Sequence, residues 1–449
     1  MAARMKYRNL VGSIAAYHYT FPALLNSLVL PAPARKRCSC LLHLNCFVMQ
    51  TISPATVSPA EKNLLQRARD LAPLLSAHVE EEVIARRLSP PVLAALREAG
   101  FLKLFLPKSL GGLEADPLTT ARLVEEVARH NTAAGWSMMV ANTSTWWCGR
   151  LPEEGVEELF RKGPDTFIAG AFHPPMKAIP TADGFIITGR NPLFSNVHEA
   201  DWIYVSIMVM DGDKPKMIDG RPDVRGAYLA PQDCQIIDTW YTIGMCATDS
   251  NDVDAQEVYV PLRRIFPLVP QFQAGRHFEG LLYQFPAVGA CVDCLLAPVA
   301  LAVARNAIEE LKAIAAKKTA LGSAGAIREK GVVQRKLGEA EALVQSSRAY
   351  LFGKIAECWD RTLSGDKLLL TDKADLLLAA AHTNQSCARA VDLVYSAGGS
   401  SAIYARSKLS KYFSDAQVIR QHGFMNDSRY ESAAQVYFDL PPDLPVIAF

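Results

Sequence analysis

The sequence lacks most of the short motifs by which a catalytic or nucleotide-binding site is usually identified. No GxGxxG segment follows a predicted strand and no GxxxxGK[ST] segment is present, so neither a dinucleotide fingerprint nor a P-loop is expected. An esterase GxSxG elbow and a zinc-protease HExxH segment are also absent. No run reaches about 18 apolar residues, the length that a membrane-spanning helix needs. These absences exclude several enzyme classes and predict a protein without a transmembrane helix.

An excess of charge of either sign is also missing. The 449 residues include 47 Lys or Arg and 46 Asp or Glu, for a formal net charge of +1. Proteins that bind nucleic acids usually carry a basic excess, so no nucleic acid partner is expected. Hydrophobic residues make up 50% of the chain. This share excludes a disordered protein and provides enough apolar surface for two or three compact domains.

Cysteine is too sparse for a disulfide framework. Of the 10 cysteines, Cys38, Cys40 and Cys46 lie near the N-terminus and the others are scattered, which predicts reduced thiols in a cytoplasmic compartment. Cys291 and Cys294 have the CxxC spacing, but no second pair of cysteines or histidines accompanies them at the spacing of a zinc site. We therefore expect no metal site.

The first 49 residues differ in composition from the rest of the chain. They contain six Lys or Arg and no Asp or Glu. Ala32-Pro33-Ala34 resembles the cleavage site of a secretory signal, but polar residues interrupt the apolar run before it. The lack of acidic residues also suits a mitochondrial transit segment, although the amphipathic pattern is weak. We favour a third interpretation, an unstructured or processed leader over residues 1–49, with the folded protein beginning near Met49.

The spacing of apolar residues divides the rest of the chain into three domains. Helical spacing predicts an N-terminal helical domain over residues 50–165, with a helix over residues 61–86. Short β-branched or aromatic runs, separated by Asp-Gly turns, predict an antiparallel β domain over residues 166–275. Long helical stretches, the last from Ser410 to Tyr437, predict a four-helix bundle over residues 276–449. The predicted fold class is α+β.

Three segments resemble the acyl-CoA dehydrogenase superfamily. Residues 184–202, GFIITGRNPLFSNVHEADW, are similar to the signature of its central β domain, and residues 244–253, GMCATDSNDV, are similar to a later segment of that domain. Residues 414–422, SDAQVIRQH, resemble its last helices. The resemblance covers about residues 60–449. It implies an acyl-CoA dehydrogenase-like fold, in which an N-terminal helical domain precedes an antiparallel β-barrel and a four-helix bundle, and it implies a flavin cofactor and a homotetramer.

The position of the dehydrogenase base points to one branch of this superfamily. Its dehydrogenases commonly place a catalytic glutamate in a Tyr-Glu-Gly-Thr segment, where this chain has His422, Gly423 and Phe424. Glycine cannot remove a proton. The chain more closely resembles the two-component flavin-dependent monooxygenases, which include phenol and secosteroid hydroxylases and dibenzothiophene monooxygenase. This resemblance implies reduced FMN or FAD from a separate flavin reductase, and a C4a-hydroperoxyflavin that transfers oxygen to an aromatic or apolar small molecule.

The same resemblance implies which side chains form the site. Ser195 and His422 are the expected catalytic residues, since a hydroxyl can bind flavin N5 and an imidazole with an ordinary pKa of about 6.5 can relay a proton at neutral pH. Trp136 and His198 are expected to line the substrate pocket. Arg328 corresponds to an arginine that reaches the flavin phosphates of a neighbouring subunit. The expected cofactor-binding residues are Phe194, Ser195, Thr248, Ser250, Arg328, Gly398 and Gly399.

Two alternatives remain open from the sequence. One is an acyl-CoA dehydrogenase that carries out FAD-dependent desaturation with a displaced base such as Asp293. The other is a non-catalytic homologue that binds flavin or serves as a scaffold. Asn191, Asn196, Cys246 and Ser414 stand where the monooxygenase branch often has other residues. The flavin or substrate end of the pocket is therefore expected to differ from that of the monooxygenase branch, and the substrate is not predicted.

Overall fold

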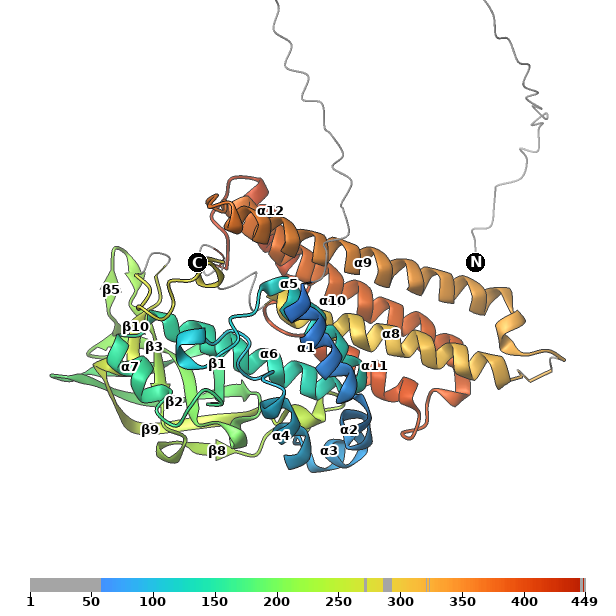
Figure 1. Ribbon diagram of the computed structural model, residues 1–449, viewed down its shortest axis with the longest axis horizontal. Helices are drawn as coiled ribbons and strands as arrows, with labels where there is room; N and C mark the ends of the chain where they lie inside the picture. The colour runs from blue at the N-terminus through green and yellow to red at the C-terminus, as the bar shows by residue number, and fades with distance from the viewer. Residues whose placement is uncertain are drawn as a thin grey trace, which may run out of the picture. The chain divides into compact units, whose positions relative to one another are not determined.

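The computed structural model describes residues 58–444 and 447, except residues 270–272, 286–292, 320 and 323. The leader expected over residues 1–49 lies outside this part of the chain. The described residues form a run of helices, then a run of strands, then a second run of helices (Figure 1). This order confirms the predicted fold class, with helical regions on both sides of a central β region.

Short helices make up the N-terminal region. The pattern over residues 61–86 forms three helices rather than one, since the helix is interrupted at Leu71 and at His78. Side-chain caps mark three of the helix starts, because a side-chain oxygen accepts from a backbone N–H in the first turn. The pairs are Ser58 with Glu61, Asp116 with Thr119 and Asn131 with Ala134. The helices are α1 (Pro59–Asp70), α2 (Ala72–Ala77), α3 (Val79–Ala85), α4 (Pro90–Glu98), α5 (Pro117–His130), α6 (Thr132–Trp147) and α7 (Glu153–Leu159).

The β region is a mixed sheet with a separate small hairpin. Its strands are β1 (Ile168–Pro180), β2 (Gly184–Phe194), β3 (Trp202–Asp211), β4 (Lys214–Pro215), β5 (Met217–Ile218), β6 (Arg221–Pro222), β7 (Val224–Leu229), β8 (Gln235–Ile237), β9 (Asn251–Pro261) and β10 (Ile265–Pro267). The order in the sheet is β10-β7-β3-β1-β2-β9-β8, with β4 paired to β3, while β5 and β6 form the hairpin.

One pairing in this sheet differs from the antiparallel barrel expected from the sequence. β1 and β3 are parallel, whereas the other described pairs are antiparallel. β2 follows β1 as a hairpin, and the chain then crosses to the other side of β1, so β3 runs in the same direction as β1. Among the described strands no pairing joins β10 to β8, and the sheet is open at these two ends.

The C-terminal region consists of long helices and a short last one. They are α8 (Asp293–Lys317), α9 (Gly331–Leu363), α10 (Leu370–Gly398), α11 (Lys408–Ile419) and α12 (Arg429–Tyr437). α10 packs against α8, α9, α11 and α12. The helix expected from Ser410 to Tyr437 is broken into α11 and α12, because residues 420–428 include the turn formers Gly423 and Asn426. His422 lies in this break.

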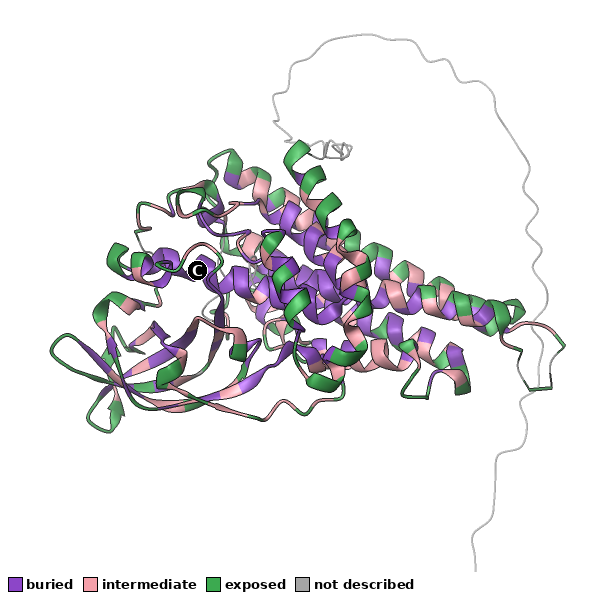
Figure 2. Cartoon of the chain, turned by 60° about the horizontal axis from the view of Figure 1, so that its bottom comes forward, coloured by how far each residue is buried: buried purple, intermediate pink, exposed green. Residues whose placement is uncertain are grey.

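α6 is buried on all sides between the other elements. Each of its residues except Val140 is buried, as expected for a helix that presents apolar or small side chains all around its axis. It contacts both β1 and α8. One large cluster of buried apolar side chains extends through the N-terminal helices, the sheet and the bundle. Figure 2 shows these buried residues along the inner faces of the helices and strands.

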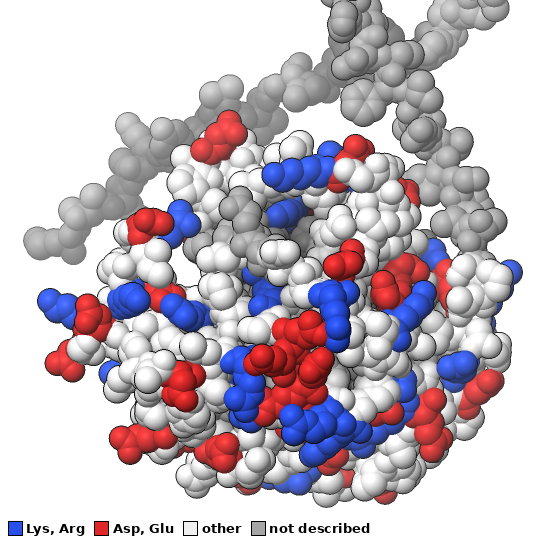
Figure 3. Space-filling view, turned by 60° about the vertical axis from the view of Figure 1, so that its left-hand side comes forward, with Lys and Arg blue, Asp and Glu red and all other residues white. Residues whose placement is uncertain are grey.

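Charged side chains do not form a broad patch of one sign on the face drawn in Figure 3, where basic and acidic residues are interspersed. Ion pairing between neighbouring elements accounts for some of this mixing. Hydrogen bonds from Arg264 and Arg263 lower the pKa of the Glu158 carboxyl to about 2. None of the helices in the described part of the chain has both the length and the apolar character that crossing a membrane requires.

Replacing Asn142 by alanine is expected to reduce the free energy of unfolding by about 3 kcal/mol. Asn142 is fully buried on α6. Its Oδ1 accepts from the backbone of Phe105 at 3.0 Å, and its Nδ2 donates to the carbonyls of Phe101 and Met138 at 2.8 and 2.7 Å. Alanine leaves buried backbone groups unpaired, which chemical denaturation would measure.

Asn306→Ala is the matched control for this prediction. Asn306 is half-buried, and its side chain donates one hydrogen bond, to the carbonyl of Arg129 at 2.7 Å. The expected loss is about 1 kcal/mol or less. Equal losses from the two variants would contradict the role assigned to Asn142.

Candidate active site

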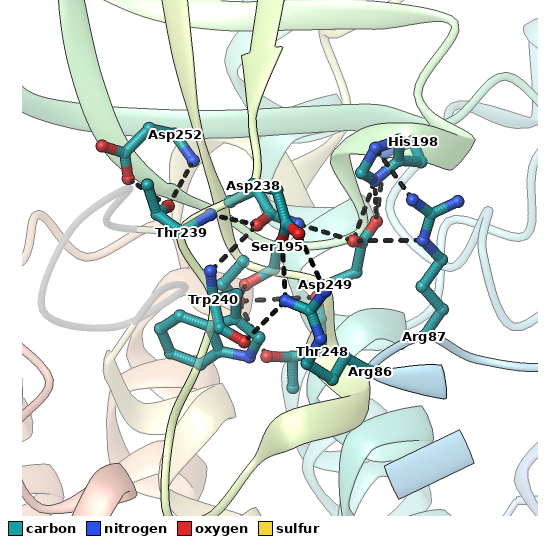
Figure 4. A network of polar contacts seen from close by, with 12 residues as sticks. Arg86, Arg87, Ser195, His198, Asp238, Thr239, Trp240, Thr248, Asp249 and Asp252 are labelled. Carbon is teal, nitrogen blue, oxygen red and sulfur yellow. Dashed lines mark hydrogen bonds and ion pairs between the residues drawn. The ribbon is translucent and has the colours of Figure 1, made fainter. Parts of the chain in front are cut away.

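Two loops meet at one end of the sheet, beside each other in Figure 4. Ser195 directly follows β2, and Ser250 directly precedes β9, its antiparallel neighbour. The end of one strand therefore lies beside the start of the other. The backbone N–H of Asn196 donates to the carbonyl of Thr248 at 2.7 Å. The structure thus brings Ser195 to Thr248 and Ser250, although Ser195 and Ser250 are 55 positions apart in the sequence.

Ser195 belongs to a continuous chain of hydrogen bonds. Its Oγ lies 3.1 Å from Trp136 Nε1 and 2.9 Å from Ser250 Oγ. Ser250 Oγ lies 2.7 Å from Thr248 Oγ1, which lies 2.9 Å from the carbonyl oxygen of Met245. An indole N–H only donates and a carbonyl only accepts. All four hydrogen bonds can therefore form at the same time in one arrangement only. Trp136 donates to Ser195, and Ser195 donates to Ser250. Ser250 then donates to Thr248, whose own hydrogen goes to the carbonyl of Met245.

This direction leaves Ser195 able to accept one more hydrogen bond but without a proton to donate. A hydroxyl has one hydrogen and two lone pairs. The hydrogen of Ser195 bonds to Ser250, and one lone pair receives the indole N–H of Trp136. Since Ser195 is only 6% exposed, solvent has little access to the remaining lone pair. The site therefore suits a ligand that presents a donor, such as an N–H group.

His422 brings the C-terminal region to the same place. Its ring packs edge-on against Trp136, with 5.2 Å between the ring centroids, and lies 5.9 Å from Phe424. The ring of Phe424 is in turn 5.8 Å from that of Phe172 on β1. Side chains from α6, from β1 and from the turn after α11 thus form one aromatic wall.

The imidazole of His422 differs from the sequence-based expectation. Burial lowers its pKa to about 4, so the expectation of an ordinary pKa of about 6.5 is wrong. The ring is therefore neutral near pH 7. Its Nδ1 is buried and has no hydrogen-bond partner among the described residues. Such atoms are uncommon in protein interiors, and this one is available to a ligand in the aromatic site.

His198 lies close to Ser195 in the sequence, but its side chain has different partners. Its Nδ1 lies 2.8 Å from Asp249 Oδ1, and its Nε2 lies 3.0 Å from Arg87 Nη2. These three side chains line a hollow of about 400 Å³ that does not include Trp136. The structure therefore does not group His198 with the aromatic wall, and its role in a substrate pocket stays a prediction.

The other expected cofactor-binding residues do not gather around Ser195. The side chain of Phe194 is fully buried in the core. Arg328 is exposed in the connection between α8 and α9. Lys318, just after α8, donates from Nζ to the carbonyl of Gly398 at 2.8 Å, and Gly399 follows with a φ of +57°. Figure 1 shows the connection between α8 and α9, which carries Arg328, at the end of the bundle farther from the sheet, and the bond from Lys318 places the end of α10 beside it.

Two side chains that hold the loops in place were not predicted as site residues. Asp415 on α11 accepts from the backbone of Met245 at 2.7 Å, across 170 positions of sequence. Asn196 donates from its side chain to Ser137 Oγ on α6. Neither contact has a local sequence motif, and the only signals were that Asn196 falls within the 184–202 segment and Asp415 within the 414–422 segment.

Comparisons with known proteins agree with this fold. Residues 58–159 match the family described as "Acyl-CoA dehydrogenase, N-terminal domain", and residues 294–427 match "Acyl-CoA dehydrogenase, C-terminal domain". The structure of XiaF from Streptomyces sp. in complex with FADH2 and glycerol superposes with a TM-score of 0.78 at 20% identity. The superposition covers 86% of this chain and 97% of XiaF.

Two relatives match over most of their length. Indole-3-acetate monooxygenase from Pseudomonas putida is 29% identical over 398 residues, which cover 88% of this chain and 98% of that protein. HsaA from Mycobacterium tuberculosis, the oxygenase subunit of a flavin-dependent monooxygenase, is 23% identical over 394 residues, which cover 86% of this chain and 96% of HsaA. The chain therefore belongs to the acyl-CoA dehydrogenase superfamily, and it is similar over most of its length to relatives named as monooxygenases.

Proposed function

We propose that this chain is an oxygenase component that hydroxylates an aromatic or apolar small molecule, with O2 and with reduced FMN or FAD supplied by a separate flavin reductase. One observation carries the proposal: the accepting hydroxyl of Ser195 and the neutral imidazole of His422 both contact Trp136. The relatives support it, since one is named a monooxygenase and another an oxygenase subunit.

The hydroxyl of Ser195 fits the reduced form of a flavin. Reduced flavin carries a hydrogen on N5 and can donate there, whereas oxidised flavin presents an accepting nitrogen. Since Ser195 has a lone pair but no proton left to donate, it can pair with the reduced form without breaking its bond to Ser250. A bound reduced flavin supplies the electrons that activate O2. The complex of XiaF with FADH2 is consistent with this choice.

The neutral ring of His422 can hold or move one proton at the substrate. Its unpartnered Nδ1 can accept a hydrogen bond from a substrate hydroxyl or N–H group. The rings of Trp136, Phe172 and Phe424 provide an apolar surface beside it, which excludes water and favours a flat aromatic ligand. The name of the indole-3-acetate monooxygenase shows one such ligand class among the relatives.

The two alternatives considered from the sequence have less support. A dehydrogenase needs a carboxylate near the flavin, but the turn after α11 carries His422 and Gly423. The side chain of Asp293, the displaced base, lies outside the described residues. In a non-catalytic homologue, a buried imidazole nitrogen without a partner would cost stability and serve no purpose.

We also propose that a homotetramer completes the cofactor site. Within one chain, Arg328, Gly398 and Gly399 lie at the far end of the bundle from Ser195. A neighbouring chain would have to bring this end to the loops before the exposed guanidinium of Arg328 could bind the flavin phosphates. The cofactor would then lie between subunits.

Ser195→Ala is expected to shorten the delay before oxidised flavin reappears when the protein, loaded with reduced flavin, meets oxygen. The variant removes the hydrogen-bond acceptor that the flavin is proposed to use. We expect a delay about tenfold shorter, equivalent to one lost hydrogen bond of ordinary strength, with more hydrogen peroxide released. Stopped-flow absorbance and a peroxide assay would measure both.

Ser432→Ala provides the control for Ser195→Ala. Ser432 is a fully buried serine on α12, and its hydroxyl donates to the carbonyl of Ser428. Its removal should leave the delay unchanged. A delay that is unaffected in Ser195→Ala, or shortened equally in both variants, would exclude the role proposed for Ser195.

His422 is expected to make the folded protein less stable as the pH falls from about 6.5 to about 4. The unfolded chain binds a proton on this imidazole below its ordinary pKa of about 6.5, while burial lowers the pKa in the folded chain to about 4. The unfolded state therefore binds more protons over this range, so the free energy of unfolding decreases and then levels off. Urea unfolding of His422→Gln should show a shallower decline than the wild type. Parallel pH curves would contradict the buried, neutral imidazole.

A further inference from the structure

We infer that Asp249 is a positioning residue that holds the Ser195 hydroxyl in its accepting orientation, and that it acts through His198 and Arg87. This inference rests on the proposed function, because it concerns the same serine. Asp249 does not touch Ser195. It joins the loop that carries Ser195 to the loop that carries Ser250 through its contacts with His198.

The carboxylate of Asp249 binds both loops at once. Its side chain is only 3% exposed. Its Oδ1 lies 2.8 Å from Nδ1 of His198, and its Oδ2 accepts from the backbone N–H of His198 at 3.2 Å. On its own loop, its Oδ1 also accepts from the side chain of Asn251 at 2.8 Å. Two of these contacts cross to the turn that follows Ser195.

The tautomer of His198 follows from its other partner. Nη2 of Arg87 lies 3.0 Å from His198 Nε2. A guanidinium can only donate, so Nε2 accepts and the ring proton lies on Nδ1, from which it is donated to Asp249. Arg87 Nε lies 3.6 Å from Asp249 Oδ1 as well. Arg87, which lies between α3 and α4, therefore contacts both His198 and Asp249 (Figure 4).

Three contacts in succession join the two loops. Ser195 meets Ser250 through their hydroxyls at 2.9 Å, Asn196 N–H meets the carbonyl of Thr248 at 2.7 Å, and His198 meets Asp249. If the last contact is lost, the loops can separate and the hydroxyl contact weakens. Ser195 then has its proton free and can turn to another rotamer. Its hydroxyl would act as a donor as often as an acceptor.

Asp249 has an unusual backbone conformation, in which an aspartate is kept at a position that would suit glycine. Its φ of +49° lies in the left-handed region, which glycine adopts without steric cost and in which Asp is among the few other residues tolerated. Glycine would remove the carboxylate without straining this turn. Asp249→Gly therefore separates the effect of the carboxylate from any effect of backbone strain.

The first test uses the protein without flavin. Hydrogen–deuterium exchange should be faster by about threefold or more in residues 194–199 of Asp249→Gly than in the wild type, since the turn loses two hydrogen bonds. Asp238→Asn is the matched control, because Asp238 lines the same hollow but pairs with Arg86 instead. Unchanged exchange in Asp249→Gly, or an equal increase in the control, would overturn the inference.

The second test measures the delay before oxidised flavin reappears, after reduced FMN or FAD and then oxygen are added. Asp249→Gly should shorten the delay about tenfold, as Ser195→Ala does, and Asp249→Asn, which keeps one accepting oxygen, should restore part of it. In the double variant with Ser195→Ala, Asp249→Gly should cause no further loss, because both act through one hydroxyl. Additive losses would overturn the inference.

The outcomes separate this inference from the proposed function. If the wild type shows no delay with either flavin, the proposed function fails. If the wild type shows a delay that Asp249→Gly leaves unchanged, the positioning role alone fails. Should Asp249→Gly not fold, His198→Phe removes the side-chain contact from the other loop and keeps the backbone one, so it is expected to shorten the delay in the same direction by a smaller factor.

Discussion

A buried hydroxyl must find its hydrogen-bond partners within the protein, and this constraint governs the site around Ser195. The indole N–H of Trp136 supplies a donor at one end of the chain of contacts, and the carbonyl of Met245 supplies an acceptor at the other. Because these two groups cannot exchange roles, the proton of Ser195 is directed toward Ser250. The serine is thereby prepared to accept a hydrogen bond from a ligand before any ligand is bound.

Each region of the fold contributes one part of this arrangement. The buried helix α6 carries Trp136 beside the sheet, and the sheet places the ends of β2 and β9 side by side. The C-terminal helices supply Asp415, which binds the backbone of Met245, and the turn that presents His422 to Trp136. The shared core explains why these parts stay in register, since the regions cannot move apart without exposing apolar surface. The site therefore forms where the N-terminal helices, the sheet and the C-terminal helices meet, and no one of these regions contains all of it.

The sequence predicts the parts of this structure that depend on local pattern or on a family signature. Helical and strand periodicity predicts the order of the three regions, and the resemblance singles out Ser195, Thr248 and Ser250, which the structure brings together. It does not predict the lowered pKa of His422, which depends on burial by side chains from other elements. The roles of Asp249 and Asp415 are likewise hidden, because their partners lie up to 170 positions away. The parallel pairing of β1 with β3 arises from a crossing that strand patterns do not record.

The most direct test of this account is the affinity of the protein for reduced and for oxidised flavin, measured anaerobically on the same sample with FMN and with FAD. An accepting Ser195 should favour the reduced form by about tenfold, the ratio equivalent to one hydrogen bond of ordinary strength, and Ser195→Ala should remove most of that preference. Equal affinities for the two forms in the wild type, or a preference that Ser195→Ala leaves intact, would contradict the direction of donation from which the function has been inferred.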